Sequence, residues 1–202
     1  MSAQNKESPK SDLDQANQLF MKKRFKDAIY LYDKILHSNP DQLEVLNNKG
    51  YALSKSGDYK EAIICYDRAL DIDPFDRSVL VNKISALRKL GNYNDAIEQC
   101  DKMLKIFPDD NIVLYHKERI LYSLGRYQDS ILCCDKILKD HPGNGDVLFD
   151  KSCSLSMLEK FEETMNFLEK AVTAGKQFKI KAKKNKVFEK LQENDRFQKL
   201  VN

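Results

Sequence analysis

Apolar residues recur along this chain in short segments with helical spacing, and polar breaks separate the segments. The stretch between Asp58 and Pro74 shows the pattern, because its apolar residues follow the spacing i, i+4, i+7 and i+8, at Ala62, Tyr66, Ala69 and Leu70. A similar segment, Leu46–Leu53, precedes it and ends at Gly57, while Pro74 follows the second segment. Glycine and proline at such places stop helices. The pattern predicts pairs of short amphipathic helices.

The pattern repeats with a period of 34 residues. Four of the five prolines share this interval: Pro40, Pro74, Pro108 and Pro142. So do an aromatic column and a mostly small column: Phe25, Tyr59, Tyr93, Tyr127 and Phe161; Ala28, Ala62, Ala96, Ser130 and Thr164. One helix pair cannot bury its apolar face alone, so consecutive pairs must stack on one another.

The repeat resembles the tetratricopeptide repeat family. In the second unit the matching residues are Leu46, Gly50, Leu53, Gly57, Tyr59, Ala62, Tyr66, Ala69 and Pro74. Five units of 34 residues follow without insertion: 9–42, 43–76, 77–110, 111–144 and 145–178. The resemblance implies an all-α fold of about twelve helices, a right-handed α-solenoid of stacked antiparallel pairs. The Gly50 column departs from the family pattern, with Ala16, Ile84, Glu118 and Ser152 in the other units.

The chain ends differ from the repeats. Residues 1–10 are expected to be a disordered polar tail, and residues 11–178 to hold the five units. Residues 179–202 are expected to form a basic capping helix and a short terminal turn. The helically spaced residues Ile180, Val187, Phe188 and Leu191 would cover the core of the fifth unit. Ser11 with Asp14, and Asp58 with Glu61, are spaced as helix N-terminal capping boxes.

Composition excludes several classes of protein. Charged residues make up 32% of the chain and hydrophobic residues 42%, which suits a folded, water-exposed protein. No glycine-rich phosphate loop and no apolar run of about 20 residues occurs, so neither a nucleotide cofactor nor a membrane span is expected. The five cysteines show no metal-ligand spacing, and without a signal segment they indicate reduced core thiols in a cytoplasmic protein.

No residues combine into a catalytic constellation. The three histidines, His37, His116 and His141, have no recognisable catalytic partner, and most carboxylates recur with the repeat. The chain is therefore expected to be a non-enzymatic scaffold or adaptor without cofactor or metal. By resemblance, the first helices of such units line a concave groove that binds a peptide segment of a partner protein.

The groove residues implied by the resemblance lie on the inner faces of the first helices. They are Asn17, Asn47, Asn48, Tyr51, Asn82, Arg88, Lys89, Tyr115, Arg119, Tyr122 and Phe149. The aromatic and basic members between 51 and 122 are expected to converge near the middle, with apolar residues at both ends. Tyrosine offers a flat apolar face and arginine binds carboxylates, so the expected ligand has acidic residues between apolar anchors. Pairing of Arg88 and Arg119 with neighbouring carboxylates is an open alternative.

Two polar ladders recur with the period. Asn48 and Asn82 could bind a peptide backbone, or they could be solvated surface amides. The carboxylate clamp by which some family members bind chaperone C-terminal tails is disfavoured, because Leu13, Ser78 and Asn82 occupy its basic positions. The other ladder combines a column of lysines with a column of acids, and we expect the two columns to neutralise each other. The lysines are Lys49, Lys83, Lys117 and Lys151, and the acids are Asp33, Asp67, Asp101, Asp135 and Glu169.

The distribution of charge along the chain suggests an alternative function. The chain carries +3 overall, but residues 176–202 hold nine Lys or Arg against three Asp or Glu, which gives +6 there and −3 elsewhere. This end could bind nucleic acid or an anionic surface, although nucleic acid is disfavoured because no paired aromatic platform accompanies the lysines. Self-association through the array ends is a third candidate.

Overall fold

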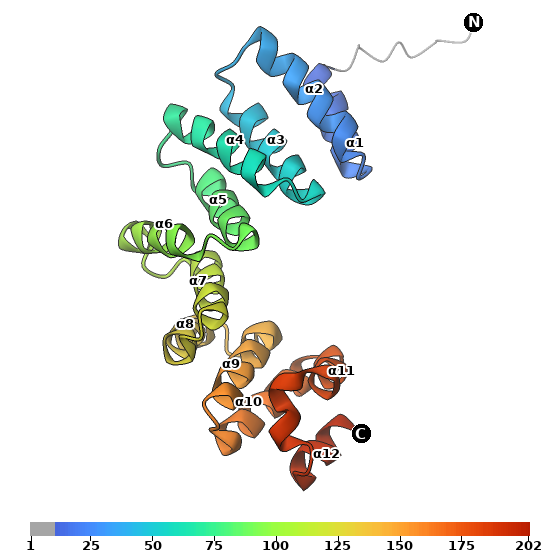
Figure 1. The fold of residues 1–202 in the computed structure, drawn as a ribbon, viewed down its shortest axis with the longest axis vertical. Coiled ribbons are helices and arrows are strands. Elements are labelled where there is room, and N and C mark those ends of the chain that lie inside the picture. The colour runs from blue at the N-terminus through green and yellow to red at the C-terminus, as the bar shows by residue number, and fades with distance from the viewer. Residues whose placement is uncertain (1–10) are drawn as a thin grey trace, which may run out of the picture. The chain divides into compact units, whose positions relative to one another are not determined.

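Every regular element of residues 11–202, the range that the computed structural model describes, is a helix (Figure 1). The α-helices are α1 (Asp12–Met21), α2 (Phe25–Ser38), α3 (Leu43–Ser56), α4 (Tyr59–Ile72), α5 (Arg77–Leu90), α6 (Tyr93–Ile106), α7 (Asn111–Ser123), α8 (Tyr127–Asp140), α9 (Gly145–Met157), α10 (Phe161–Ala174), α11 (Gln177–Lys184) and α12 (Asp195–Val201). A 3₁₀-helix, η1 (Lys186–Leu191), lies between the last two. The expected tail at 1–10 falls outside the described residues.

The chain divides into two compact units, Met1–Ala96 and Ile97–Asn202, called the N-terminal and C-terminal units below. In the N-terminal unit, consecutive helices from α1 to α5 pack against one another. In the C-terminal unit the same holds from α7 to α12, with η1 against α9. The all-α fold of stacked antiparallel helix pairs is thus confirmed in each unit.

Helix ends follow the repeat. Each proline of the 34-residue column lies two residues beyond the end of a second helix, where its ring cannot obstruct the helix. Gly57, Gly91 and Gly125 follow first helices with φ of 95°, 84° and 72°, a left-handed conformation that glycine adopts freely. Lys23 and Glu159 hold the same place in the end units with φ of 60° and 58°. The backbone turn therefore persists where the glycine is lost.

Helix capping agrees with the sequence at one of two places. Ser11 and Asp14 form the expected box, with Ser11 Oγ accepting from Asp14 N at 3.1 Å. The Asp58 box was wrong, since Asp58 makes no side-chain cap. Asp58 has φ −83° and ψ 62°, an inverse γ-turn conformation, whereas Ser11 has the extended backbone that suits a capping residue.

Side-chain sizes compensate one another where the two helices of a repeat meet. A side chain on Gly50 would lie 2.6 Å from the ring of Tyr66, so the small residue makes room for the tyrosine. In the fourth repeat the corresponding residues are Glu118 and Cys134, both buried. A larger residue on the first helix is thus matched by a smaller one on the second. The departures at the Gly50 column are compensated rather than loosely packed.

All five cysteines are buried and free, as expected for core residues. Burial raises the pKa of the Cys133 thiol to about 11 and that of the Cys100 thiol to about 12. Thiols with such pKa values remain protonated near neutral pH and react slowly.

The segment after α10 covers the last helix pair, with one difference from the expected pattern. Phe178, Phe188 and Phe197 are buried in a cluster with α9 and α10. Ile180 was expected in this stripe but is 61% exposed. The helix ends at Lys184, and Asn185 is extended, so the helical phase of 180 does not continue to 187.

Candidate functional site

A hollow of about 200 Å³ opens between α1 and α3 of the N-terminal unit. Six residues line it: Asn17, Phe20, Met21, Tyr32, Asn48 and Tyr51. Three of them, Asn17, Asn48 and Tyr51, are sequence-predicted groove residues. We call this hollow the α1–α3 pocket.

Two asparagines form the polar base of the α1–α3 pocket. Tyr32 Oη donates to Asn17 Oδ1 at 2.6 Å, and Asn48 Nδ2 donates to the same oxygen at 3.3 Å. Burial raises the pKa of Tyr32 to about 12, so its hydroxyl stays a donor. Among residues 11–202, Asn17 Nδ2 and Asn48 Oδ1 have no hydrogen-bond partner. They offer one donor group and one acceptor, the pair that a peptide group requires.

The walls of the α1–α3 pocket are aromatic and apolar. The rings of Phe20 and Tyr51 lie 5.3 Å apart between centroids, and Met21 is 78% exposed at the rim. Lys55 Nζ lies 4.9 Å from the centroid of the Tyr51 ring. Within the described range neither Lys55 nor Lys89 has a carboxylate partner. Lys89 follows Lys55 by one repeat and lies 5.7 Å from the Tyr59 ring centroid.

The other predicted groove asparagines of this unit, Asn47 and Asn82, bond to each other. Asn82 Nδ2 donates to Asn47 Oδ1 at 3.0 Å, and Asn47 Nδ2 donates to Ser78 Oγ at 3.1 Å. Asn48 and Asn82, the expected ladder, therefore have different partners, Asn17 and Asn47. Arg88 lies half-buried in the last turn of α5.

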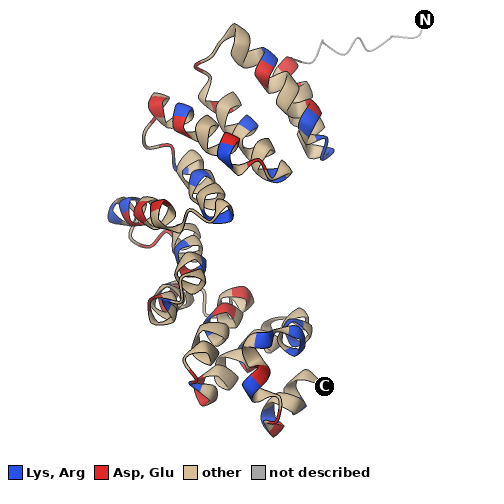
Figure 2. Cartoon of the chain, in the orientation of Figure 1, with Lys and Arg blue, Asp and Glu red and all other residues tan. Residues whose placement is uncertain are grey.

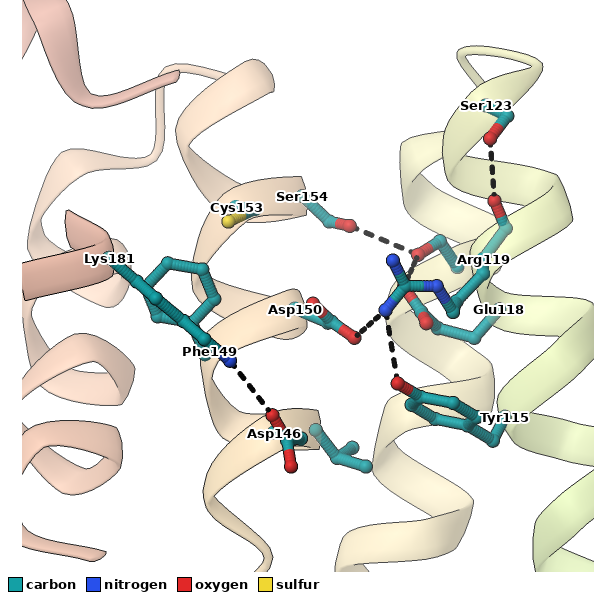
Figure 3. Close-up of polar contacts among 12 residues, drawn as sticks. Tyr115, Glu118, Arg119, Ser123, Asp146, Phe149, Asp150, Cys153, Ser154 and Lys181 are labelled. Atoms are coloured by element: carbon teal, nitrogen blue, oxygen red, sulfur yellow. Dashed lines mark hydrogen bonds and ion pairs between the residues drawn. The ribbon is translucent and has the colours of Figure 1, made fainter. Parts of the chain in front are cut away.

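The equivalent face of the C-terminal unit is occupied by an ion pair (Figure 3). Arg119 Nη1 lies 3.2 Å from Asp150 Oδ2 and 3.0 Å from the hydroxyl of Tyr115. Burial raises the pKa of Asp150, and Arg119 opposes that effect. Arg119, Tyr115 and Asp150 satisfy one another, so the open alternative of a neighbouring carboxylate holds for Arg119. Tyr122, one turn further along α7, packs edge-on against Tyr127.

Phe149 is not available to a peptide, which corrects its assignment to the groove. It is 7% exposed and its ring lies 5.6 Å from that of Phe178 and 5.8 Å from that of Phe188. Lys181 crosses above it and contacts Asp146 at 3.2 Å (Figure 3). The reason is the path of the chain after α10, which lays α11 and η1 over this part of α9.

A buried polar network behind this face was missed from the sequence. Glu118 is 2% exposed and accepts a hydrogen bond from Ser130 Oγ at 3.0 Å, while Ser130 and Ser154 hydroxyls lie 3.0 Å apart. Ser130 replaces the alanine of its column in the same repeat where Glu118 replaces the glycine. That paired change was the available signal.

The ladder of opposite charges pairs internally, as expected. Lys49, Lys83 and Lys117 each contact the acid of the preceding second helix at 2.5 Å, and Lys151 contacts Asp135. Glu169, which no further repeat follows, is held instead by Arg196 of α12 through two hydrogen bonds, 2.5 and 2.7 Å long. The ladder is therefore a structural feature of the repeat.

In the part of the chain that the structure describes, no group of His, Cys, Asp or Glu is arranged to hold a metal ion. No helix there has the length and hydropathy needed to cross a membrane.

These features define a helical-repeat protein with a small polar–aromatic pocket on its first helices. The sequence matches the tetratricopeptide repeat family over residues 43–76 and again over 80–145. The chain is a tetratricopeptide repeat protein.

Solved structures of the same fold are distant in sequence. YrrB, described as a TPR protein with an unusual peptide-binding site, is 20% identical with a TM-score of 0.69 over 90% of this chain and 94% of its own. A tetratricopeptide repeat protein from Parabacteroides merdae is 18% identical with a TM-score of 0.80, covering 94% and 75%. A MamA structure from Desulfovibrio magneticus is 14% identical, with a TM-score of 0.75 over 84% and 98%. No curated protein matches the sequence.

Proposed function

We propose that this protein is a non-enzymatic interaction module that binds an extended segment of a partner protein at the α1–α3 pocket. The observation that carries the proposal is that Asn17 Nδ2 and Asn48 Oδ1, a donor and an acceptor without partners among residues 11–202, lie together at the base of an aromatic hollow. A peptide group that bonds to both amides would place its neighbouring side chain against the rings of Phe20 and Tyr51. The peptide-binding site in the description of YrrB supports this kind of role without identifying a ligand.

The ligand would combine an apolar anchor with an acidic residue. The α1–α3 pocket is walled by Phe20, Met21 and Tyr51, which suit an aliphatic or aromatic side chain. Lys55 lies at its edge, and Lys89 lies one repeat further on, where an acidic side chain would be neutralised. Neighbouring helices lie about 8–10 Å apart, which an extended chain spans in about three residues. Acidic residues one and about four positions from the anchor would suit the two lysines.

Arg119 is not part of this proposal, because Asp150 and Tyr115 occupy its guanidinium. The acidic part of the ligand is therefore assigned to the lysines of the N-terminal unit. This revises the residues and keeps the ligand class, an acidic and hydrophobic segment.

The test is a selection of 12-residue peptides from a random library displayed on phage, using the full chain, followed by titration of the selected peptides. We expect selected sequences to share an apolar residue followed by acidic residues. Tyr51→Ser and Lys55→Glu should each weaken binding at least tenfold, because one removes a wall of the pocket and the other reverses a charge at its rim.

Matched controls separate this site from general surface effects. Tyr30→Ser and Lys60→Glu make the same changes at exposed positions on the second helices α2 and α4. They should bind as the wild type does. Equal losses in the control pair, or no loss in the test pair, would contradict the assignment of the pocket.

A further inference from the structure

The lysines of the C-terminal segment differ from those of the ladder in having few acidic partners. Every ladder lysine contacts an aspartate. Among residues 176–202, Lys181, Lys190 and Arg196 have carboxylate partners. The other lysines have none within residues 11–202: Lys176, Lys179, Lys183, Lys184, Lys186 and Lys199. The capping role of this segment does not account for them.

Three of these lysines surround one exposed apolar residue. Ile180 is 61% exposed on α11, opposite the buried Phe178 and Ala182. Lys176, Lys183 and Lys184 lie at positions i−4, i+3 and i+4 from Ile180 and thus on the same side of the helix. Figure 2 shows the concentration of basic residues on α11. Together with Lys186, just beyond the end of α11, these residues form what we call the lysine face: Lys176, Ile180, Lys183, Lys184 and Lys186.

A hollow of about 230 Å³ extends the lysine face beyond the end of α11. Lys183, Lys184 and Lys186 line it together with Asn185, Gln192 and one carboxylate, Glu189. Lys183 Nζ donates to the amide oxygen of Asn202 at 2.9 Å, which orients the ammonium without neutralising it. Three ammonium groups against one carboxylate leave the hollow cationic, so it would attract anionic groups.

We propose that the lysine face docks on an anionic lipid surface. The lysines would lie among acidic headgroups while Ile180 reaches the boundary of the acyl chains, as in helices that lie in the plane of a membrane interface. Nucleic acid fits less well, because Phe178, Phe188 and Phe197 are all buried and no aromatic ring of this segment can stack on a base. The acidic remainder of the chain would be repelled, so contact would occur through this face.

The first experiment is co-sedimentation of the full chain with phosphatidylcholine vesicles with and without 30 mol% phosphatidylglycerol. We expect binding only with the anionic lipid, and loss of binding between 50 and 500 mM salt, because screening weakens the attraction. Replacing Lys176, Lys183, Lys184 and Lys186 with Gln should reduce partitioning by about fivefold per lysine. Ile180→Ser should reduce it by about tenfold.

The matched control removes four other lysines that lack carboxylate partners, Lys26, Lys60, Lys136 and Lys139, all exposed on second helices. It has the same net charge as the test variant and should bind vesicles far more tightly. Equal loss in both variants would show that net charge alone acts and would overturn the proposal. So would equal binding to vesicles of phosphatidylcholine alone, or tighter binding of a DNA duplex or of polyglutamate than of the anionic vesicles.

A second readout does not depend on removing lysines. The chain has no tryptophan, so Ile180→Trp introduces a single tryptophan, which can be excited selectively, at the centre of the lysine face. Its emission should shift to the blue when anionic vesicles are added, while the emission of a Leu132→Trp variant, changed at an exposed position on α8, should not shift. If the Ile180→Trp variant bound the vesicles with its emission unshifted, another surface would lie at the membrane and the proposal would be overturned.

Discussion

The two units use the same first-helix positions in opposite ways. In the N-terminal unit these positions hold asparagines and aromatic residues around the α1–α3 pocket, whose base retains an unused donor and acceptor. In the C-terminal unit they hold Arg119, Asp150 and Phe149, which are satisfied by one another or covered by α11 and η1. The repeat thus determines the positions of the side chains on the first-helix face. The chemistry of those side chains and the path of the chain determine whether this face is open to a ligand.

The largest difference should appear when one aromatic residue is removed from each face. Phe149→Ala should lower the free energy of unfolding by about 3–5 kcal/mol, because a buried ring between two others is lost. Tyr51→Ala should cost about 1 kcal/mol or less, because Tyr51 is 38% exposed. Urea denaturation followed by circular dichroism measures both. Equal costs would mean that the two faces are equally exposed.

The contact at the Gly50 column should show that different repeats reach similar packing with side chains of different volume. Gly50→Ile should cost about 1–3 kcal/mol because it meets the Tyr66 ring. Adding Tyr66→Cys should recover part of that loss, because the next repeat has the same pair, Ile84 with Cys100. A double variant as unstable as the sum of the two single variants would refute compensation.

The ion pair on the face of the C-terminal unit should make stability depend on pH. Arg119→Met should cost about 1–3 kcal/mol near pH 7, because Asp150 loses the charge that offsets its burial. The pKa of Asp150 is raised in the folded protein, so the folded state binds this proton more tightly than the unfolded state does.

The stability contributed by Asp150 therefore falls as pH rises from its unfolded pKa of about 3.9 through its folded pKa. Without Arg119 the folded pKa rises further, so this fall becomes larger in the variant. Denaturation midpoints between pH 4 and 8, compared with those of Lys55→Met in the N-terminal unit, provide the measurement. Parallel pH profiles of the two variants would contradict the electrostatic role of Arg119.

The ladder should give the smallest effects, and here the two units should agree. Lys49→Met and Lys83→Met in one unit, and Lys117→Met in the other, should each cost about 0–1 kcal/mol, because the acids are about half exposed. Thermal unfolding at low and high salt checks this. A cost above about 2 kcal/mol in either unit would show that the ladder does more than neutralise charge.

The periodicity predicted the fold because packing positions recur with it: the helix pairs, their stops, the internal ladder and the buried cysteines. It did not predict lateral contacts on the first-helix faces, because equal repeat positions do not touch there. The observed hydrogen bonds join residues 31 or 35 apart, as in Asn17–Asn48 and Asn47–Asn82.

The covering of Phe149 could not be predicted either, because it depends on a break at Asn185 that no repeat contains. Ile180 is exposed because α11 buries the opposite side, with Phe178 and Ala182. The path of the chain outside the repeats therefore decided that Phe149 is covered, whereas Arg119 is occupied by Asp150 within the repeats.

The most direct test of the open and closed faces is a nuclear magnetic resonance titration of the full chain with a selected 12-residue peptide. The side-chain amide signals of Asn17 and Asn48 should shift with the peptide, since these groups are assigned to its backbone. The backbone amides of Asp150 and Cys153 should stay unchanged. Shifts at Asp150 and Cys153 with Asn17 and Asn48 unmoved would contradict the account.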